Sequence, residues 1–344
     1  MALLELKNLK TFFATKRGTV KAVNGVSYSL DAGKVLGVVG ESGSGKSVSA
    51  MSILRLLDGN GYIDSGEILF NGVDLTKLSM NEMYKIRGNE ISVIFQEPMT
   101  SLNPVFTVSR QISEPLMIHQ GMTKKQAAAK AVELLSDVKI PNPEVVAKQY
   151  PHQLSGGMRQ RVMIAMALAC EPDILIADEP TTALDVTIQA QILDLMKSLQ
   201  KELGMAIILI THDLGVVAQM CDEVIVMYAG SICEQGTADE IFYNPCHEYT
   251  KGLLRSIPSA SNVGEKLEPI HGTPIDLLNM PAGCPFAPRC EAAMKICLRE
   301  RAERMRINED HLASCWMNVK KGLEDGSIEL AEDKDAERKD GADA

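Results

Sequence analysis

Hydrophobic and polar positions along the first ninety residues follow patterns that predict strands. They alternate regularly over residues 3–9 and less regularly over residues 20–30. Residues 35–39 carry no polar side chain, which is typical of a parallel strand buried on both faces. Residues 65–72 form another short strand pattern, which ends in an Asn-Gly turn. We therefore expect a strand-rich beginning, interrupted by a helix from Lys46. The buried face of that helix is predicted to carry Val48, Met51, Leu54 and Leu57.

The pattern changes to helices between about residues 97 and 172. Thr123 and Gln126 have the spacing of a capping box, and an Ala-rich amphipathic run follows as far as Val138. Residues 158–170 are apolar enough for a helix that is buried on most sides. This part of the chain is predicted to be a helical insertion.

Strand patterns return after the insertion and alternate with a helix. Residues 174–177, 206–210 and 224–228 are short apolar runs of strand length. Between the first two runs, apolar residues recur at helical spacing from 188 to 203, and Gly204 ends that pattern. Alternation of this kind predicts an α/β fold built on a largely parallel sheet.

The periodicity weakens after about Tyr249, where Pro, Gly and Cys accumulate. We therefore predict a main domain over residues 1–250, with its helical part at about 97–172. A small loop-rich, cysteine-rich module is predicted over 251–320. Residues 321–344 are charged and nearly free of large apolar side chains, which is typical of a disordered tail.

Composition narrows the class of protein. Hydrophobic residues make up 45% of the 344 positions, as in ordinary globular proteins. Apolar runs stay well short of the roughly 18 to 20 residues that span a bilayer. The first ten residues lack the features of a signal peptide. A net charge of −10 argues against general binding to nucleic acid, because phosphate contacts need clustered cations.

A phosphate-binding motif follows the first buried strand. Residues 40–47, GESGSGKS, match G-x-x-x-x-G-K-[ST] between a strand and a helix, which is the context this motif requires. Backbone N–H groups of such a loop bind phosphates at a helix N-terminus. Lys46 would reach the β- and γ-phosphates, and Ser47 would ligate Mg²⁺. A Gly-rich turn without a ligand is the alternative. The other residues predicted to bind the nucleotide are Gly40, Ser42, Gly43, Ser44 and Gly45.

Two carboxylates follow a second buried strand. Asp178 and Glu179 come directly after residues 174–177, at the strand end where ligands bind in α/β proteins. Asp178 fits a ligand of Mg²⁺, directly or through water. Glu179 fits a base that orients and polarises the attacking water. An ordinary solvated strand end is the structural alternative for this pair.

Residues 154–160, LSGGMRQ, identify the family. Ser155, Gly156 and Gly157 lead into a helix and resemble the signature motif of ATP-binding cassette (ABC) ATPases. The other markers occur in the family's order: Gln96 is similar to the Q-loop glutamine, residues 183–185 to the D-loop, and His212 to the switch histidine. The resemblance covers about residues 3–260 and implies a P-loop NTPase cassette with a mixed sheet and a helical subdomain.

The resemblance also implies a mechanism. Two cassettes pair head-to-tail, so that ATP on the Walker loop of one chain meets the signature residues and Asp185 of the other. His212 would contact the γ-phosphate, and Gln96 would contact Mg²⁺ and transmit to the helical subdomain. An aromatic residue early in the first sheet stacks on adenine in this family; Phe13 is the first choice and Phe12 its rival, with core packing the alternative for either.

The branch of the family is indicated by longer stretches. Residues 95–104, 178–187 and 244–250 resemble the ATPases of dipeptide, oligopeptide and nickel importers. This resemblance implies a subunit that hydrolyses ATP to import dipeptides or oligopeptides, at the cytoplasmic face of the cell membrane. The implied partners are two permease subunits, a solute-binding protein and a second ATPase subunit, which is often a paralogue.

Eight cysteines divide into two groups. Cys170, Cys221, Cys233 and Cys246 are scattered and are interpreted as small apolar residues. Four thiolates in the second group suit either Zn²⁺ or an iron–sulfur cluster, and the absence of C-x2-C pairs favours the cluster. The same region resembles the C-terminal part of these importers, some of which bind [4Fe–4S]; unligated thiols are the alternative. The second group is Cys284, Cys290, Cys297 and Cys315.

Alternative functions remain at this point. The same machinery imports nickel or other small solutes. A soluble cassette ATPase acting on ribosomes or DNA usually carries two cassettes, a coiled-coil arm or a basic linker, and the sequence has none of these. A P-loop kinase would leave residues 155–160 and His212 without a role.

Overall fold

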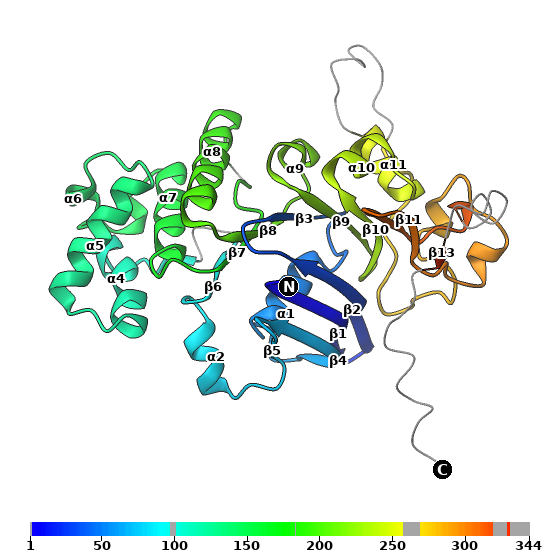
Figure 1. The fold of residues 1–344 in the computed structure, drawn as a ribbon, viewed down its shortest axis with the longest axis horizontal. Helices are drawn as coiled ribbons and strands as arrows, with labels where there is room; N and C mark the ends of the chain where they lie inside the picture. Colours follow the sequence, from blue (N-terminus) through cyan, green and yellow to red (C-terminus); the bar gives the residue numbers. More distant parts are fainter. Residues whose placement is uncertain (1, 97–100, 183, 257–268, 319–328, 331–344) are drawn as a thin grey trace.

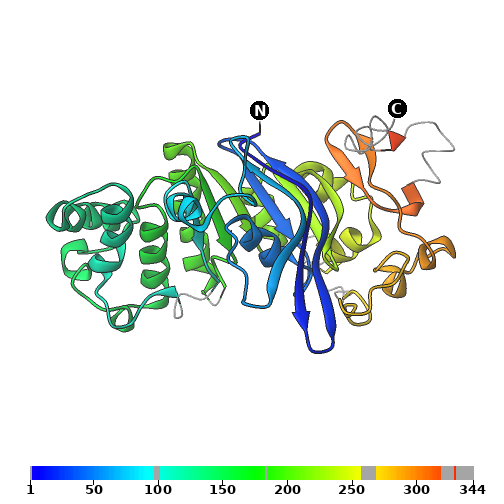
Figure 2. The same ribbon diagram turned by 90° about the horizontal axis from the view of Figure 1, so that it is seen from below.

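The computed structural model describes residues 2–96, 101–182, 184–256, 269–318 and 329–330. The predicted tail, apart from residues 329–330, lies outside this description, as do Glu97–Thr100 and Ala183 of the stretches used above. Two sheets form the middle of the molecule (Figure 1). The helical insertion and the C-terminal residues lie at opposite ends, as Figure 2 also shows.

A nine-stranded sheet forms the centre, in the order β13-β11-β12-β10-β9-β3-β8-β7-β6. Its strands from β9 to β6 run parallel, and the others are antiparallel. The parallel strands are β3 (Val35–Val39), β6 (Ile91–Ile94), β7 (Ile174–Asp178), β8 (Ala206–Ile210) and β9 (Glu223–Tyr228). All residues of β3, β7 and β8 are buried, which confirms the predicted buried strands and the α/β class.

The strands of the first segment form a second, antiparallel sheet in the order β2-β1-β4-β5. They are β1 (Leu4–Thr15), β2 (Gly18–Leu30), β4 (Gly61–Phe70) and β5 (Val73–Asp74). The expected Asn-Gly turn joins β4 to β5, with positive φ angles at Asn71 (49°) and Gly72 (79°). Both angles are those that a type I′ turn requires.

Helix α1 (Lys46–Ile53) begins where the sequence predicts, but its buried face differs. Ser49, Ala50 and Ile53 are buried, whereas Val48 and Met51 are only partly so. The reason is that α1 contacts both β1 and β2 of one sheet and β8 of the other. A helix between two sheets has no single solvent face, so an apolar stripe does not describe it.

The helical insertion agrees with the predicted range. Its helices are α4 (Val108–His119), α5 (Lys124–Asp137), α6 (Pro143–Val146) and α7 (Gly156–Ala167), with a 3₁₀ turn at Pro151–Gln153. The predicted capping box is present: the Thr123 hydroxyl accepts the Gln126 N–H, and the Gln126 side chain bonds back to Thr123. Before the insertion lies α2 (Met80–Ile86), which has a capping box of its own.

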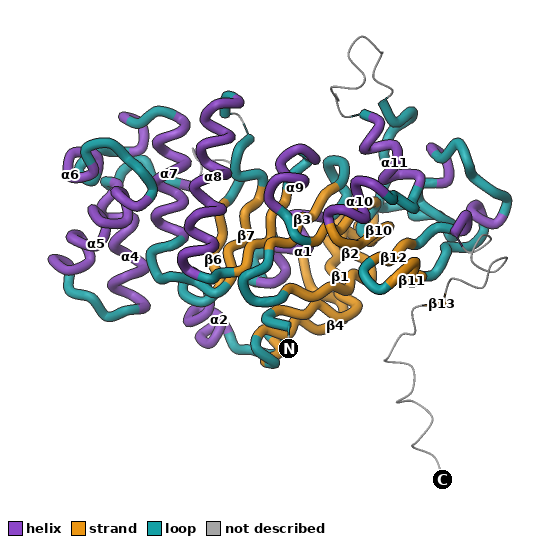
Figure 3. Tube along the Cα trace, turned by 45° about the horizontal axis from the view of Figure 1, so that its top comes forward, coloured by secondary structure: helices purple, strands orange, loops and turns teal. Residues whose placement is uncertain are grey.

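Two further helices, α8 (Val186–Leu203) and α9 (Leu214–Met220), lie beside the parallel strands in Figure 3. The apolar stripe predicted for α8 is largely buried, and Gly204 ends the helix with φ 65°, a left-handed conformation that glycine adopts at little cost. No helix among the described residues is long and apolar enough to cross a membrane.

The C-terminal residues extend the central sheet. Strand β10 (Ser231–Thr237) pairs with β12 (His311–Ala313), which pairs in turn with β11 (Met305–Asn308) and through it with β13 (Glu329–Leu330). Helices α10 (Ala238–Tyr243) and α11 (Glu248–Arg255) precede this hairpin. Two 3₁₀ turns, Ala287–Arg289 and Ile296–Leu298, lie between, in a segment otherwise without regular structure. The division of the chain near residue 250 stays a prediction.

Candidate functional site

Four loops that carry the predicted chemistry meet at one edge of the central sheet. Strands β3, β8, β7 and β6 are neighbours and run parallel, with Asp178 opposite Ile210 in register. Their carboxyl ends therefore lie side by side. The loop of residues 40–47 follows β3, Glu179 follows β7, His212 follows β8 and Gln96 follows β6.

The loop of residues 40–47 is held in the form of an anion-binding turn. The buried Lys46 side chain crosses beneath it, and its Nζ donates to the carbonyls of Gly40 at 2.8 Å and Glu41 at 2.9 Å. Gly40 has φ 146°, and a Cβ there would lie 2.2 Å from the Met227 carbonyl oxygen. Only glycine fits at this position. The loop therefore keeps its backbone close to strand β9 and leads into α1, where free N–H groups bind anions.

Ser47 and Asp178 form the part of the site that suits Mg²⁺. The Ser47 hydroxyl donates to Asp178 Oδ1 at 3.0 Å. Burial raises the pKa of Asp178, and it lowers the pKa of Lys46, while Glu179 and Asp178 counteract the effect on the lysine. The oxygens of both residues fit a hard cation, which would replace the Ser47 proton as the partner of the carboxylate.

Glu179 is the centre of a polar cluster. Its Oε2 accepts from Gln96 Nε2 at 3.0 Å and from the Thr182 hydroxyl at 2.8 Å, and its Oε1 lies 3.1 Å from His212 Nδ1. Burial alone would raise the pKa of Glu179, but hydrogen bonds from Thr182 and His212 outweigh it and the pKa falls below its ordinary value. Glu179 is therefore an ionised carboxylate.

The backbone at Glu179 is also unusual. Its φ of 47° is left-handed, while its N–H still donates to the Ile210 carbonyl at 2.8 Å. A non-glycine residue in this conformation costs on the order of 1 kcal/mol and is typical of functional sites. The turn directs the carboxylate toward Gln96 and His212. Sequence reasoning placed these three residues correctly and missed Thr182.

The signature residues lie apart from this cluster. Ser155 caps α7 by accepting the Met158 N–H at 3.3 Å, and Asp185 caps α8 by accepting the Ile188 N–H at 2.9 Å. A Cβ on Gly157 would lie 2.9 Å from Ile188, so α7 and the start of α8 are in contact. Within the described ranges no hydrogen bond joins Ser155, Gly156, Gly157 or Asp185 to the loop of residues 40–47.

The two candidate aromatic residues on β1 have different surroundings. Phe12 is buried, meets Tyr62 edge-on with ring centroids 6.3 Å apart, and lies under Lys21 Nζ at 5.9 Å. Phe13 is partly exposed and pairs in register with Val20. Val20 lines a cavity together with Ser42, Gly43 and Ser44 of the phosphate-binding loop. Phe13 is therefore on the side of β1 that faces that loop.

Glu41, at the second position of the loop, is tied to the C-terminal residues. Arg289 donates to both oxygens of its carboxylate, at 2.5 and 2.8 Å, and the Arg289 side chain is only 5% exposed. The Glu41 N–H donates to the hydroxyl of the buried Tyr249 at 2.7 Å. The hydrogen bonds to Glu41 raise the pKa of Arg289. Sequence reasoning noted Arg289 only as part of the cysteine region.

The four C-terminal cysteines are partly buried and near one another. The Cys284 N–H donates to the Cys297 carbonyl at 2.7 Å, and Cys297 Sγ accepts the Met294 N–H at 3.4 Å. Burial raises the pKa of Cys290 to about 11, with smaller contributions that include Cys315 and Cys284. A different set is the closest group: one ligand atom each of Glu234, Cys246 and His311 lie within 4.8 Å of one another.

Comparison with known proteins gives consistent matches. The family described as ABC transporter matches residues 23–182, and the family described as oligopeptide/dipeptide transporter, C-terminal region, matches residues 233–297. The dipeptide transport ATP-binding protein DppD of Bacillus subtilis is 54% identical over 315 residues, which cover 91% of this chain and 94% of that protein. The oligopeptide transport ATP-binding protein OppD of the same organism is 55% identical, over 92% of this chain and 88% of that protein.

Solved structures agree with these matches. The dimeric structure of MJ0796, a bacterial ABC transporter cassette, has a TM-score of 0.62 at 30% identity and covers 68% of this chain and 98% of that one. A post-hydrolysis structure of MJ0796, bound to ADP and Pi, matches equally well.

The fold and the strand-end site define an ATP-binding cassette of the P-loop class. At more than 50% identity over nearly the whole length of these relatives, the chain belongs to the family of ATP-binding subunits of dipeptide and oligopeptide ABC transporters.

The ion pair between Arg289 and Glu41 generates a prediction. Replacing either residue (Arg289→Met or Glu41→Gln) leaves the other charge partly buried without its partner, so each change is expected to destabilise the fold and weaken ATP binding. In a double-mutant cycle measured by urea unfolding, we expect a coupling energy of about 1–3 kcal/mol. The exposed Arg299→Met serves as the matched control. Additive effects of the two changes would contradict a direct coupling.

Proposed function

We propose that this chain is the ATP-hydrolysing subunit that powers import of dipeptides or oligopeptides. The observation that carries the proposal is the contact of Glu179 with Gln96, Thr182 and His212 beside the phosphate-binding loop. An ionised carboxylate at this place is suited to accept a proton from the attacking water. The peptide cargo is supported by the relatives, whose names specify dipeptide and oligopeptide transport.

Each residue has a role in this proposal. Backbone N–H groups of residues 40–47 and the Lys46 ammonium bind the phosphates of ATP. Ser47 and Asp178, with Gln96, would hold Mg²⁺, which neutralises charge on the phosphates when it is bound. Glu179 orients the water, and His212, on the next strand, contacts the γ-phosphate and keeps Glu179 in position.

A second cassette completes the site. Ser155, Gly156, Gly157 and Asp185 would bind ATP held by the partner, which accounts for their lack of bonds to the loop of their own chain. A helix N-terminus such as that of α7 favours the negative charge of a phosphate. Solved cassettes with this fold are dimeric. The partner would be a paralogous subunit, so that each chain supplies half of two composite sites.

Membrane subunits would convert this cycle into transport. Closing of two cassettes on ATP and opening after hydrolysis would move two permease subunits between inward- and outward-facing states. The chain would then be peripheral, on the cytoplasmic face of the membrane, and a solute-binding protein would deliver the peptide. Nickel or another small solute is the alternative cargo. No observation on the described residues favours a role on ribosomes or DNA.

Phe13 is proposed to stack on adenine. Its position opposite Val20, which borders the phosphate-binding loop, supports this role. Phe12 is instead occupied by contacts with Tyr62 and Lys21.

We also propose that Cys284, Cys290, Cys297 and Cys315 bind a [4Fe–4S] cluster. Zinc would need its thiolates about 3.8 Å apart, from the length of Zn–S bonds in a tetrahedron. Among the described residues, no three of these sulfurs lie within 4.8 Å of one another. A cubane cluster accepts wider spacing, because each thiolate binds a different iron. Arg301, which acts electrostatically on Cys284, would offset the negative charge of such a cluster.

Replacement of the base tests the ATPase proposal. Glu179→Gln keeps the size of the side chain but cannot accept a proton, so ATP turnover should fall by about 100-fold or more while ATP binding persists. Phosphate release and nucleotide affinity measure the two effects separately. The exposed Glu202→Gln is the control and should retain full turnover. Turnover in Glu179→Gln close to that of the unaltered protein would sink the assignment.

The cysteine proposal predicts a brown protein. After anaerobic purification we expect broad visible absorbance and about four irons per chain, both lost in Cys284→Ser but retained in Cys221→Ser. Metal analysis that finds one zinc and no iron would refute the cluster.

A further inference from the structure

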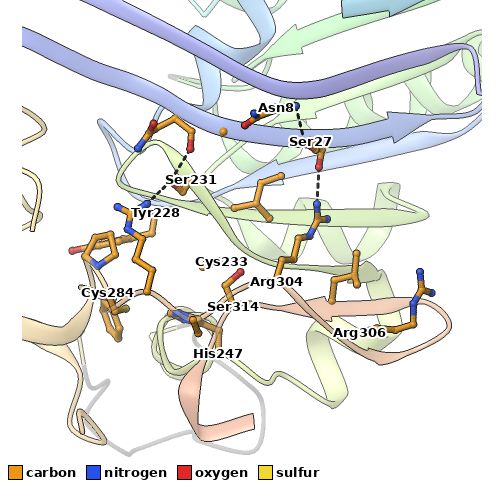
Figure 4. A pocket seen from close by; sticks show the side chains of 18 residues that line it. Asn8, Ser27, Tyr228, Ser231, Cys233, His247, Cys284, Arg304, Arg306 and Ser314 are labelled. Carbon is orange, nitrogen blue, oxygen red and sulfur yellow. Dashed lines mark hydrogen bonds between the residues drawn. The ribbon is translucent and has the colours of Figure 1, made fainter. Parts of the chain in front are cut away.

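A cavity of about 400 Å³ lies where the C-terminal residues meet the cassette, away from the loop of residues 40–47. Its walls come from β2, β10, the segment before β11 and the residue after β12 (Figure 4). The lining combines apolar side chains, such as Ile232, Phe286 and Leu312, with polar and cationic ones. It has the size and mixed character of a pocket for a small organic molecule.

Two arginine side chains supply the charge in this cavity. Arg304 reaches from the segment before β11 toward β2, where its Nη1 donates to the Ser27 carbonyl at 2.9 Å; its Nη2 donates to Gln235 (Figure 4). Arg301 Nη1 donates to the Ser231 hydroxyl at 3.2 Å. All these acceptors are neutral groups. Each guanidinium has five N–H donors, so both keep donors for a further partner.

Neither arginine has a carboxylate partner among the described residues, and no acidic side chain there lines the cavity. Arg304 Nε is buried and makes no hydrogen bond. Burial lowers the pKa of Arg304 to about 10 and also lowers that of Arg301. A buried guanidinium is normally paired, because removing a charge from water is costly. The counter-charge that this cavity needs is therefore not supplied by the residues around it.

Other lining groups are also donors. His247 Nδ1 accepts the Tyr249 N–H at 3.1 Å, which places the ring proton on Nε2. Burial lowers the pKa of His247 to about 4, so the ring is neutral at pH 7 and Nε2 donates. The hydroxyl of Ser314 belongs to the same wall. Cationic and neutral donors thus surround one space.

We propose that this cavity binds a small organic phosphate, with its phosphate group held by Arg301 and Arg304. Two guanidiniums match the double negative charge of a phosphate monoester, and their planar N–H pairs match its oxygens. The apolar part of the lining accommodates a carbon skeleton. A zwitterionic peptide fits less well, because its ammonium group would find no carboxylate.

The site is distinct from the cysteines and from the ATP site. Of the four cysteines, only Cys284 lines the cavity. A bound phosphate would connect residues 301–304 to β2 and β10, and so strengthen the docking of the C-terminal residues on the cassette. The proposal does not depend on the transport function.

Titration calorimetry on the full chain tests this proposal, with glycerol 3-phosphate as the probe and inorganic phosphate as a second ligand. A Lys46→Ala background suppresses binding at the Walker loop. We expect saturable 1:1 binding, weakened about tenfold or more by Arg301→Gln or Arg304→Gln, since each removes a charged hydrogen-bond donor. Arg299→Gln removes the same charge from an exposed position outside the cavity and should change nothing.

The outcomes separate the alternatives. Equal weakening by Arg299→Gln would mean nonspecific attraction, and no saturable binding of either phosphate would overturn the site. Citrate binding without phosphate binding would overturn the ligand class. Iron analysis of the same variants is the second readout: loss of iron in Arg301→Gln, without any phosphate binding in the parent, would assign Arg301 to the cysteines instead. Should Arg304→Gln fold poorly, Arg301→Gln and Arg304→Lys carry the test, and Arg304→Lys should retain weakened binding.

Discussion

The parallel register of four buried strands is the constraint on which the site depends. Residues far apart in sequence can act on one phosphate only because β3, β8, β7 and β6 end at the same edge of the sheet. Their side chains are wholly apolar through most of their length, so a shift in register would bury polar groups and expose the core. The hydrophobic effect thereby fixes the positions of Lys46, Asp178, Glu179 and His212.

The C-terminal residues act on this arrangement from the outside. Arg289 and Tyr249 hold Glu41 inside the phosphate-binding loop, so the shape of the loop depends on residues about 200 or more positions later. The β11–β12 hairpin extends the central sheet through β10, and the arginine-lined cavity lies at the same junction. Any event that changes how these residues dock therefore reaches the ATP site through a short chain of contacts.

Sequence patterns predicted the parts of the fold that depend on local rules. The limits of β3 and β8 agree with the apolar runs, and the Thr123 cap and the Gly204 stop are both present. The face of α1 was predicted wrongly, because packing between two sheets overrides a one-sided pattern. Motif order also brought the main site residues together correctly, since the loops follow adjacent strands.

Contacts across long separations could not be predicted in the same way. Nothing in the sequence around Glu41 indicates a partner 248 residues away, and nothing pairs residues 311–313 with β10. Such contacts are set by tertiary packing and not by local preference. The cavity around Arg301 and Arg304 is of this kind, because its walls come from three separate parts of the chain.

The central claim is that hydrolysis at these strand ends drives peptide import, and one measurement tests it directly. The chain would be purified with its permease subunits and second ATPase, reconstituted into liposomes, and assayed for ATP hydrolysis and labelled peptide uptake together. The account predicts hydrolysis that rises when peptide-loaded binding protein is added, with uptake in proportion. Hydrolysis that ignores the peptide, with no uptake, would contradict it.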